Sequence, residues 1–445
     1  NSSNLVNPMP DFDHIKKVTL ELLDYCRREN WAGYDPYDAL NSRLFAATPF
    51  HRSRLCRIVL TQLLRRLPVN IRPLLRIDKE QNPKALALFL MAFIKLKKLD
   101  LLPDEGVIQT MLDRLAVLRS RVASTSPSNP SNPSNSSNSS NPSNSYHCWG
   151  YSFPWQGRDV LVPRGAPNLV CTIFVADALL DLYESSGLAE GGLQPSPPST
   201  VCLGMALSAA DYIVDELYWE DAEAAGFSYP LPSVRARVHN ANFLAAALLC
   251  RVWKHTGDKR YLEPALRAAR YSAARQNSDG SWYYGEKPTQ RWIDNFHTGY
   301  NLCALKSIGD HIDSDEFDRH LTRGFDFYRK HFFDDSGAPR YFHDRTYPVD
   351  IHCVAQSIIT LLTLRHLQPG GEGLALNICR WALAGMRNGT GFFFYQRFPS
   401  FTNRIPYMRW SQAWMLLALA TLLEAISESR GKGGGGRSPA CESCE

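Results

Sequence analysis

The feature that most constrains this chain is a repeated unit in which a glycine-aromatic loop leads into an apolar helix. Such loops begin at Gly150, Gly226, Gly280, Gly337 and Gly391, and the last four starts are 54 to 57 residues apart. A weaker copy begins at Gly33 and reaches its helix near residues 82–96. A fixed period of this length is the signature of a fold built from repeated supersecondary units. The pattern therefore predicts six copies of one structural unit.

Each unit contains two helices of different character. The first, as in residues 243–253 or 414–423, is apolar on nearly every side, which is typical of a buried helix. The second, as in 261–275 or 317–330, has apolar residues three and four positions apart, which predicts an amphipathic helix. Glycines such as Gly257 and Gly309 are expected to end the first helix. The units therefore predict six inner and six outer helices.

The two ends of the chain have complementary gaps. The last inner helix, about 409–426, has no outer helix after it, and the N-terminal helix, about 12–28, has no inner helix before it. Pairing the two closes a ring, whereas an open solenoid would leave both unpaired. We therefore predict an all-α fold, an (α/α)6 toroid, as a single domain over residues 1–430. The Ser/Asn/Pro insertion 124–145 and the Gly-rich tail 431–445 should be disordered, because neither has apolar surface to bury.

The amino-acid composition restricts the binding partners and the cellular location that we expect for this protein. Lys and Arg number 49 and Asp and Glu 44, so the net charge of +5 over 445 residues is too mild to indicate nucleic-acid binding. No apolar run reaches the roughly 18 residues of a membrane-spanning helix, so no transmembrane segment is expected. Most of the eleven cysteines lie in apolar helical stretches, which favours reduced thiols and a cytoplasmic location. Because the sequence starts with Asn1, a removed signal peptide and secretion stay open. The sequence does not indicate an oligomeric state.

The loops that precede the inner helices should meet at one end of the ring, where their polar residues would converge. Asp294 and His297 lie three positions apart at a predicted helix start and so share a face. Asp350 and His352 occupy the matching place in the next unit. Glycoside hydrolysis requires two carboxyl groups across a sugar, so these four residues are the candidate catalytic set. The alternative is that Asp294 is a helix cap and that the histidines are core residues.

Other residues of the same loops are candidates for substrate binding. Exposed aromatic rings beside hydrogen-bonding groups suit the apolar faces and polar edges of sugars, although such rings can equally pack the rim. The candidates are Trp155, Arg158, Trp282, Tyr284, Glu286, Trp292, Asn295, Tyr347, Tyr395, Asn403, Arg404, Tyr407, Arg409 and Trp410. Arg404 and Arg409 suit an anionic group such as a uronic carboxylate. Alternatively, they pair with Asp294 or Asp350 and hold the rim.

The signatures of several other chemistries are absent from the sequence. It contains no Gly-x-Ser-x-Gly elbow, no phosphate-cradling Gly-x-x-x-x-Gly-Lys-Ser/Thr loop and no His-Glu-x-x-His motif. The spacings Asp294-x-x-His297 and Asp350-x-His352 could hold a metal, but such spacing alone is a weak signal. We therefore expect neither a metal nor a cofactor.

Six segments carry a resemblance to a known family. The longest are Trp292-Ile293-Asp294-Asn295-Phe296-His297-Thr298-Gly299-Tyr300 and Thr402-Asn403-Arg404-Ile405-Pro406-Tyr407-Met408-Arg409-Trp410, and the others are 33–38, 82–86, 163–168 and 347–352. In these segments the chain resembles six-hairpin glycosidase-like toroid proteins found with bacterial and archaeal polysaccharide-biosynthesis genes. The resemblance spans nearly the whole chain outside the insertion and the tail. It implies a toroid and a carbohydrate context, and it brings no catalytic set with it.

Three functions are compatible with these observations. The first is a glycoside hydrolase acting on a glycan or a lipid-linked oligosaccharide, with Asp294 and Asp350 as its carboxyl pair. The second is a uronyl lyase or C5-epimerase, in which His, Tyr or Arg abstracts a proton beside a carboxylate that Arg404 or Arg409 neutralises. The third is a non-catalytic glycan-binding or scaffold protein. Toroids support many chemistries, so the fold by itself does not choose among the three.

Overall fold

The computed structural model describes residues 11–123, 145–158, 160–186 and 197–433. Of the segments predicted to be disordered, 124–144 and 434–445 lie outside these residues. The two predicted boundaries were each slightly off. Ser145 pairs with Ala123 in a short antiparallel ladder, and the last helix continues through the first residues of the predicted tail to Gly433.

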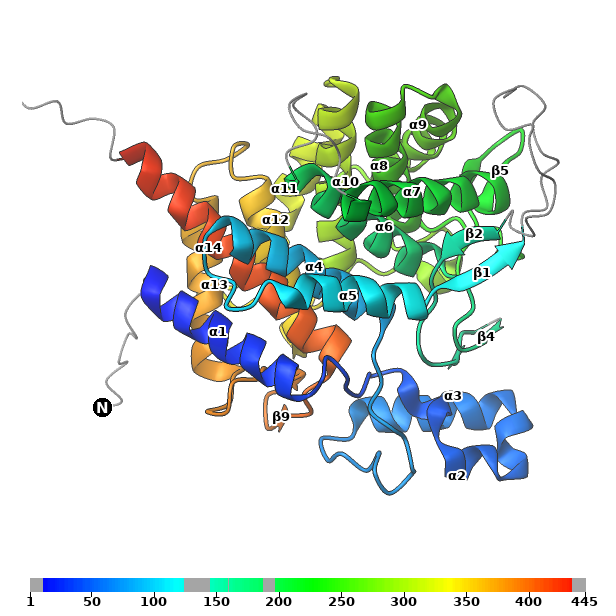
Figure 1. Cartoon of the computed structure of the whole chain (residues 1–445), viewed down its shortest axis with the longest axis vertical. Helices are drawn as coiled ribbons and strands as arrows, with labels where there is room; N and C mark the ends of the chain where they lie inside the picture. The colour runs from blue at the N-terminus through cyan, green and yellow to red at the C-terminus, as the bar shows by residue number, and fades with distance from the viewer. Residues whose placement is uncertain (1–10, 124–144, 159, 187–196, 434–445) are drawn as a thin grey trace, which may run out of the picture.

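Six inner helices form a closed ring (Figure 1). They are α4 (Pro83–Lys98), α6 (Leu169–Ser185), α8 (His239–Thr256), α10 (Asn295–Ile312), α12 (Ile351–Thr363) and α14 (Trp414–Gly433). Each packs against the next in this order, and α14 packs against α4. Most of their apolar side chains are buried on every side, as the sequence pattern predicts for helices enclosed by others.

Each inner helix has an outer partner. The outer helices are α1 (Phe12–Arg28), α5 (Gly106–Val117), α7 (Pro197–Tyr212), α9 (Lys259–Ala273), α11 (Asp318–His331) and α13 (Gly371–Gly385). The last five each pack on the inner helix before them, whereas α1 packs on α14 from the other end of the chain (Figure 1). The predicted pairing of the two chain ends is thus confirmed, and so is the (α/α)6 toroid.

Two of the predicted helix ends had different outcomes. Gly257 ends α8 in the left-handed conformation with φ of 70°, as predicted. Gly309 lies inside α10, which continues to Ile312. Asp313 takes the left-handed conformation there instead, with φ of 51°, which Asp tolerates better than most residues with a side chain. The prediction for Gly309 was therefore wrong, because a mid-helix glycine weakens a helix without necessarily ending it.

The loops between the helices contain short antiparallel strands. These are β1 (Ser120–Ala123) with β2 (Ser145–Cys148), β3 (Trp155–Gln156) with β4 (Leu161–Val162), β5 (Tyr218–Glu220) with β6 (Ala225–Phe227), and β7 (Val349–Asp350), β8 (Gln396–Arg397) and β9 (Thr402–Asn403) as one sheet. The three-stranded sheet joins the loops of the fifth and sixth units. It therefore fixes the entries of α12 and α14 relative to each other.

Side-chain caps fix where the inner helices begin. Asn82, Asn168, Asp294 and Asp350 each accept a hydrogen bond from a backbone N–H in the first turn of α4, α6, α10 and α12. Such caps satisfy donors that have no partner within the helix. Because all four belong to loops at the same end of the ring, that end presents a fixed set of helix starts.

An additional element lies between α1 and α4. It contains α2 (Arg43–Ala46) and α3 (Arg54–Arg66), with a small core of its own around Ala39, Leu64 and Ile77. Figure 1 shows α2 and α3 at the edge of the molecule, away from the helices of the ring. The repeat period does not predict these two helices, because they interrupt it.

Two further sequence expectations concern the cysteines and membrane helices. The nine cysteines in the described part of the chain are all free thiols, and Cys26, Cys171, Cys250, Cys353 and Cys379 are buried among apolar neighbours. No helix in the same part of the chain is long and apolar enough to cross a bilayer.

Candidate functional site

A cavity of about 370 Å³ lies at the end of the ring where the inner helices begin. One position of the repeat contributes to its lining from all six units, namely the second residue after the N-cap. These residues are Lys84, Val170, Asn240, Phe296, His352 and, in the π-helical turn Met408–Ala413 before α14, Arg409. Equivalent positions of a closed ring converge on its axis, so the repeat itself generates this site.

Asp294 and His297 form a hydrogen-bonded pair on the cavity wall. The Asp294 Oδ1 atom accepts the backbone N–H of His297 at 2.9 Å, so the predicted capping role is confirmed. Its Oδ2 atom lies 2.7 Å from Nδ1 of His297 and accepts Nε1–H of Trp292 at 2.9 Å. The carboxylate is buried, whereas the imidazole is 21% exposed. With Nδ1 held by Asp294, Nε2 is the ring nitrogen left for a ligand.

His352 is the second imidazole of the cavity and is almost fully buried. Its Nε2 lies 2.8 Å from the hydroxyl of Tyr300, and its Nδ1 has no hydrogen-bond partner among the described residues. Burial, followed by the charges of Lys84 and Arg409, holds the pKa of His352 well below its usual range, so its ring is neutral at pH 7. The Phe296 ring centre lies 4.1 Å from that of His297 and 4.6 Å from that of His352, so one ring contacts both imidazoles.

Lys84 is a buried cation-forming residue that the sequence analysis missed. Its Nζ atom lies 3.9 Å from the ring centre of Phe174 and 5.3 to 5.4 Å from those of Trp414 and Tyr300. It forms no ion pair with any carboxylate of the described chain. Burial, together with the nearby Arg409, holds the pKa of Lys84 well below its ordinary value. The cavity thus contains an amine without a counter-ion.

Arg65 reaches the cavity from α3, outside the repeat. Its Nε donates to the hydroxyl of Tyr395 at 3.3 Å, and its guanidinium lies 5.2 Å from the ring centre of Tyr37. Among the described residues no carboxylate pairs with it. Asp294 is the one carboxylate that the described residues place in the lining, and neither Arg65 nor Lys84 forms an ion pair with it.

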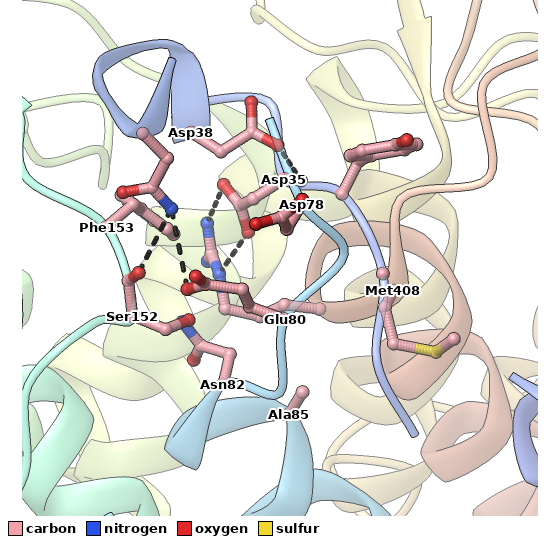
Figure 2. Close-up of a pocket in the computed structure, with 13 residues that line it drawn as sticks. Asp35, Asp38, Asp78, Glu80, Asn82, Ala85, Ser152, Phe153 and Met408 are labelled. Carbon is pink, nitrogen blue, oxygen red and sulfur yellow. Dashed lines mark hydrogen bonds and ion pairs between the residues drawn. The ribbon is translucent and has the colours of Figure 1, made fainter. Parts of the chain in front are cut away.

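Arg409 borders the cavity but is already engaged by a carboxylate. Its Nε and Nη2 atoms donate to Asp35 at 2.7 and 2.8 Å, and both side chains are buried. Burial opposes the charge of Arg409, but the attraction of Asp35 outweighs it and raises the pKa of the guanidinium. Figure 2 shows the small pocket where the loops of the first and last units meet, with Asp35, Glu80 and Met408 among the residues that line it.

The predicted alternative that Arg404 and Arg409 pair with Asp294 or Asp350 was wrong. Arg409 pairs with Asp35, because ring closure brings the loop of the first unit against the last. Arg404 is exposed, and its guanidinium lies 5.4 Å from the ring centre of Phe394.

Asp350 lies outside the cavity lining, fully buried beneath it. Its Oδ1 accepts the backbone N–H of His352 at 2.8 Å and Nε1–H of Trp410 at 2.9 Å, and its Oδ2 accepts Nε2–H of Gln396 at 2.7 Å. Burial raises the pKa of Asp350 to about 6, against the effect of these hydrogen bonds. The structure therefore does not bring Asp294 and Asp350 together across one cavity, because Asp350 caps α12 and supports Trp410 and Gln396.

The predicted binding residues divide by location. Trp155, Tyr284, Trp292, Arg409 and Trp410 line the cavity, and the Tyr284 and Trp292 rings are stacked with centres 4.6 Å apart. The others do not line it: Trp282, Asn295, Tyr395, Asn403 and Tyr407 are buried in the framework, Glu286 pairs with Arg237 and Arg275, and Arg158, Tyr347 and Arg404 are exposed elsewhere. Residues of the same loop differ in whether they line the cavity or pack in the framework, so membership of a loop was too coarse a criterion.

Several lining residues were missed in addition to Lys84 and Arg65. They are Tyr37, Tyr151, Phe153, Val170, Tyr229, Asn240, Phe296, Tyr300, Tyr341 and Phe342. The repeat held a usable signal for Lys84, Val170 and Asn240, since each stands two places after a cap. The Oδ1 of Asn240 and the Nε1 of Trp155 are buried without a hydrogen-bond partner among the described residues, which suits a polar ligand.

Metal binding would need a cluster of suitable ligands. Within the described ranges, no group of three or more His, Cys, Asp or Glu residues is arranged to hold a metal ion.

Comparison with known proteins identifies the fold. No protein-family model and no curated protein sequence matches the chain. A GH76 alpha-mannanase of Bacteroides thetaiotaomicron matches with a TM-score of 0.55 and 10% identity, over 81% of this chain and 90% of that one. An unsaturated glucuronyl hydrolase of Streptococcus agalactiae gives 0.52 and 8% over 94% and 93%, and a D-mannose isomerase gives 0.53 and 11% over 78% and 87%.

The chain has the six-hairpin toroid fold. The resemblance inferred from the sequence is thus confirmed for the fold. Two of these three structures are named as glycan hydrolases and one as an isomerase, so the six-hairpin toroid alone does not select a reaction. The side chains that line the cavity are what can distinguish one reaction from another.

Proposed function

We propose that this protein is an acid–base enzyme that moves a proton on a sugar or oligosaccharide, at a carbon next to a carbonyl or carboxylate group. The observation that carries the proposal is the Asp294–His297 pair, with Oδ2 and Nδ1 2.7 Å apart on the wall of the cavity. This geometry fixes the orientation and the tautomer of the imidazole, as a general base requires.

The shape and polarity of the cavity support a carbohydrate as substrate. The stacked Tyr284 and Trp292 rings and the indoles of Trp155 and Trp410 provide apolar faces for the C–H side of a sugar. The unpartnered polar atoms of Asn240 and His352 provide hydrogen bonds for its hydroxyl groups. The structural neighbours named as a mannanase, a glucuronyl hydrolase and a mannose isomerase point to the same substrate class.

Two imidazoles provide the two proton-transfer groups that isomerisation or epimerisation needs. His297, held at Nδ1 by Asp294, would remove a proton through Nε2 and, once protonated, could return it to the neighbouring carbon. His352 is neutral and hydrogen-bonded to Tyr300 at 2.8 Å, so this second pair could hydrogen-bond the substrate oxygen whose proton moves in the same step. Both imidazoles contact Phe296, which places them around one part of the cavity.

Lys84 and Arg65 would stabilise the negative charge that develops when a proton leaves. Neither has a carboxylate partner in the described chain, so each is free to bind a carbonyl or carboxylate oxygen of the substrate. This role was assigned from the sequence to Arg404 and Arg409. Arg409 is occupied by Asp35 and Arg404 is exposed outside the lining, so the two new residues fit it better.

Glycoside hydrolysis is less well supported by this geometry. Canonical hydrolysis uses two carboxyl groups on either side of the scissile bond. The described residues contribute one carboxylate to the lining, Asp294, and Asp350 is enclosed by three hydrogen bonds. A hydrolase therefore becomes an alternative outcome of the experiment.

The test is proton exchange with solvent. The protein is incubated in heavy water with neutral aldoses and ketoses, uronic acids and their short oligosaccharides, and each mixture is followed by NMR and mass spectrometry. We expect deuterium at one sugar carbon with the wild type and none with His297→Gln. An unsaturated product would also support proton abstraction and would assign a lyase.

Two outcomes contradict the proposal. Cleavage with gain of water and no exchange would show a hydrolase. Binding of a saccharide that never changes would show a glycan-binding protein. Arg158→Gln is the matched control, because Arg158 is exposed and does not line the cavity.

A further inference from the structure

The element between α1 and α4 has an apolar surface that nothing in the described chain covers. On α3, Leu55, Val59 and Leu63 recur every four residues and so lie on one side of the helix, with 70%, 56% and 49% of their surfaces exposed. Arg66, eleven residues after Leu55, falls on the same side. We call these four residues the α3 face.

The exposed apolar residues are concentrated in this element. Thirteen large apolar side chains are exposed in the described chain, and seven of them lie within residues 44–74. The seven are Leu44, Phe50, Leu55, Val59, Leu63, Val69 and Leu74. Isolated exposed apolar residues are ordinary, but a concentration of this kind marks an interaction surface.

The charge of the same element is one-sided. Residues 43–77 contain eight arginines and no Asp or Glu, which leaves 41 basic and 44 acidic residues in the rest of the chain. The segment 43–77 therefore carries a net charge of +8, and the rest of the chain a net charge of −3. Arg43 and Arg72 are paired with Asp78 and Asp38. Arg52, Arg54, Arg66 and Arg76 are exposed and form no ion pair with a described carboxylate.

Internal packing does not account for the α3 face. The opposite side of α3 supplies Leu64 to the small core with Ala39 and Ile77, and Leu60 packs against it. The element is thus stabilised from within, and Figure 1 shows α3 at the edge of the molecule. The exposed leucines and arginines of this element are therefore not needed for its internal packing.

We propose that the α3 face docks on a membrane surface that contains anionic lipid. Aliphatic side chains enter the boundary between headgroups and acyl chains, while arginines bind the lipid phosphates. A second copy of the chain fits less well, because it would bring the arginines of segment 43–77 against each other, and that segment contains no carboxylate. Nucleic acid would use the arginines but would leave Leu55, Val59 and Leu63 without a role.

Helix α3 contributes residues both to the docking surface and to the candidate site. Arg65 lies on α3, next to Arg66, and its side chain lines the cavity. Docking would therefore hold the mouth of the cavity close to saccharides attached to lipids. This inference concerns the surface alone and stands whichever reaction the cavity performs.

The experiment is sedimentation of the full chain with vesicles of phosphatidylcholine, alone or with 30% phosphatidylglycerol, at low and at physiological salt. We expect binding to the anionic vesicles that exceeds binding to the neutral ones by at least about tenfold and weakens with salt. The triple variant Leu55→Ser/Val59→Ser/Leu63→Ser and the double variant Arg54→Glu/Arg66→Glu should each reduce it by about tenfold or more.

Matched controls use exposed residues elsewhere. Val117→Ser/Val201→Ser and Arg291→Glu/Arg319→Glu change the same kinds of side chain and should leave vesicle binding unchanged. Equal binding to both kinds of vesicle, no binding at low salt, or equal loss in the controls would overturn the proposal. The proposal would also be overturned if light scattering showed that the wild type is a dimer and that the triple variant is a monomer. Binding to RNA that is tighter than binding to vesicles, and that displaces the protein from them, would overturn it as well.

Discussion

The guanidinium of Arg409 and the carboxylate of Asp35 are joined by hydrogen bonds of 2.7 and 2.8 Å across 374 positions of the sequence. The pair connects the loop of the first unit to the entry of the last inner helix, at the point where the ring closes. Both groups are buried, so each depends on the other for its charge to be tolerated. Arg409 also borders the cavity, which links ring closure to the candidate site.

Arg409→Met should lower the free energy of unfolding by about 3–5 kcal/mol, because it leaves the Asp35 carboxylate buried and unpaired. The double variant Asp35→Asn/Arg409→Met should recover part of this loss. Urea denaturation of the single and double variants measures the coupling. Additive losses would mean that the two side chains contribute independently, and Arg158→Met, at an exposed position, should change nothing.

Asp294→Asn should reduce turnover at least about 100-fold while the protein stays folded. Asn caps a helix as well as Asp does, so the first turn of α10 is retained, whereas the carboxylate that holds Nδ1 of His297 is lost. Turnover and the thermal midpoint are both measured. Full activity in a folded Asp294→Asn variant would remove Asp294 from the proposed mechanism.

Asp350 offers the contrasting case of a carboxylate that acts in the framework. Asp350→Ala should lower the free energy of unfolding by about 2–4 kcal/mol, because it removes a cap and leaves Trp410 and Gln396 without their acceptor. Asp350→Asn should be milder and should keep most of the turnover. Loss of turnover in a stable Asp350→Asn variant would instead support a catalytic pair.

The difference in the free energy of unfolding between the wild type and Asp350→Asn should depend on pH, because Asp350 titrates and Asn does not. Burial raises its pKa to about 6, so the folded protein binds a proton more tightly than the unfolded chain does. The wild type should therefore lose stability relative to Asp350→Asn as the pH rises from about 4 to above 6, by an amount on the order of 1–3 kcal/mol. Denaturation at pH 4.5 and 7.5 measures it, and an opposite slope would show that the hydrogen bonds outweigh burial.

Lys84→Met should raise the free energy of unfolding at pH 7 by about 1–3 kcal/mol and should abolish or sharply reduce turnover. The pKa of Lys84 is lowered in the fold, so the folded protein binds the lysine proton less tightly than the unfolded chain does. This cost to stability disappears as the pH rises toward the ordinary lysine pKa, and the gap between variant and wild type should narrow from pH 7 to 10. A gap that widens with pH would mean that the fold raises the pKa of Lys84.

The six-fold architecture could be predicted because its causes are local and periodic. The spacing of the glycine-aromatic loops, the all-round apolarity of the inner helices and the unpaired helix at each end of the chain were sufficient to predict a closed ring. The capping role of Asp294 and its contact with His297 also follow from the four consecutive residues 294–297, which form one helical turn. Each of these depends on short-range geometry that every copy of the unit repeats.

The assignment of side chains to the cavity was less predictable. Asp350 matches Asp294 in the repeat, yet Trp410 and Gln396 from other units enclose it. Lys84 stands in the same register as His352, but its unpaired state depends on which charges the rest of the ring brings near. Arg65 comes from an element that interrupts the period, so the repeat does not predict that its side chain lines the cavity.

The sequence by itself thus determined the closed ring of helices and the end of the ring at which polar residues gather, because periodic apolarity and helix capping act over a few residues. Only the tertiary structure decided which carboxylate meets the cavity, which cation lacks a partner and which arginine meets Asp35. Those outcomes depend on burial and on contacts between units far apart in the chain, and electrostatic energies depend on such distances and on the exclusion of water.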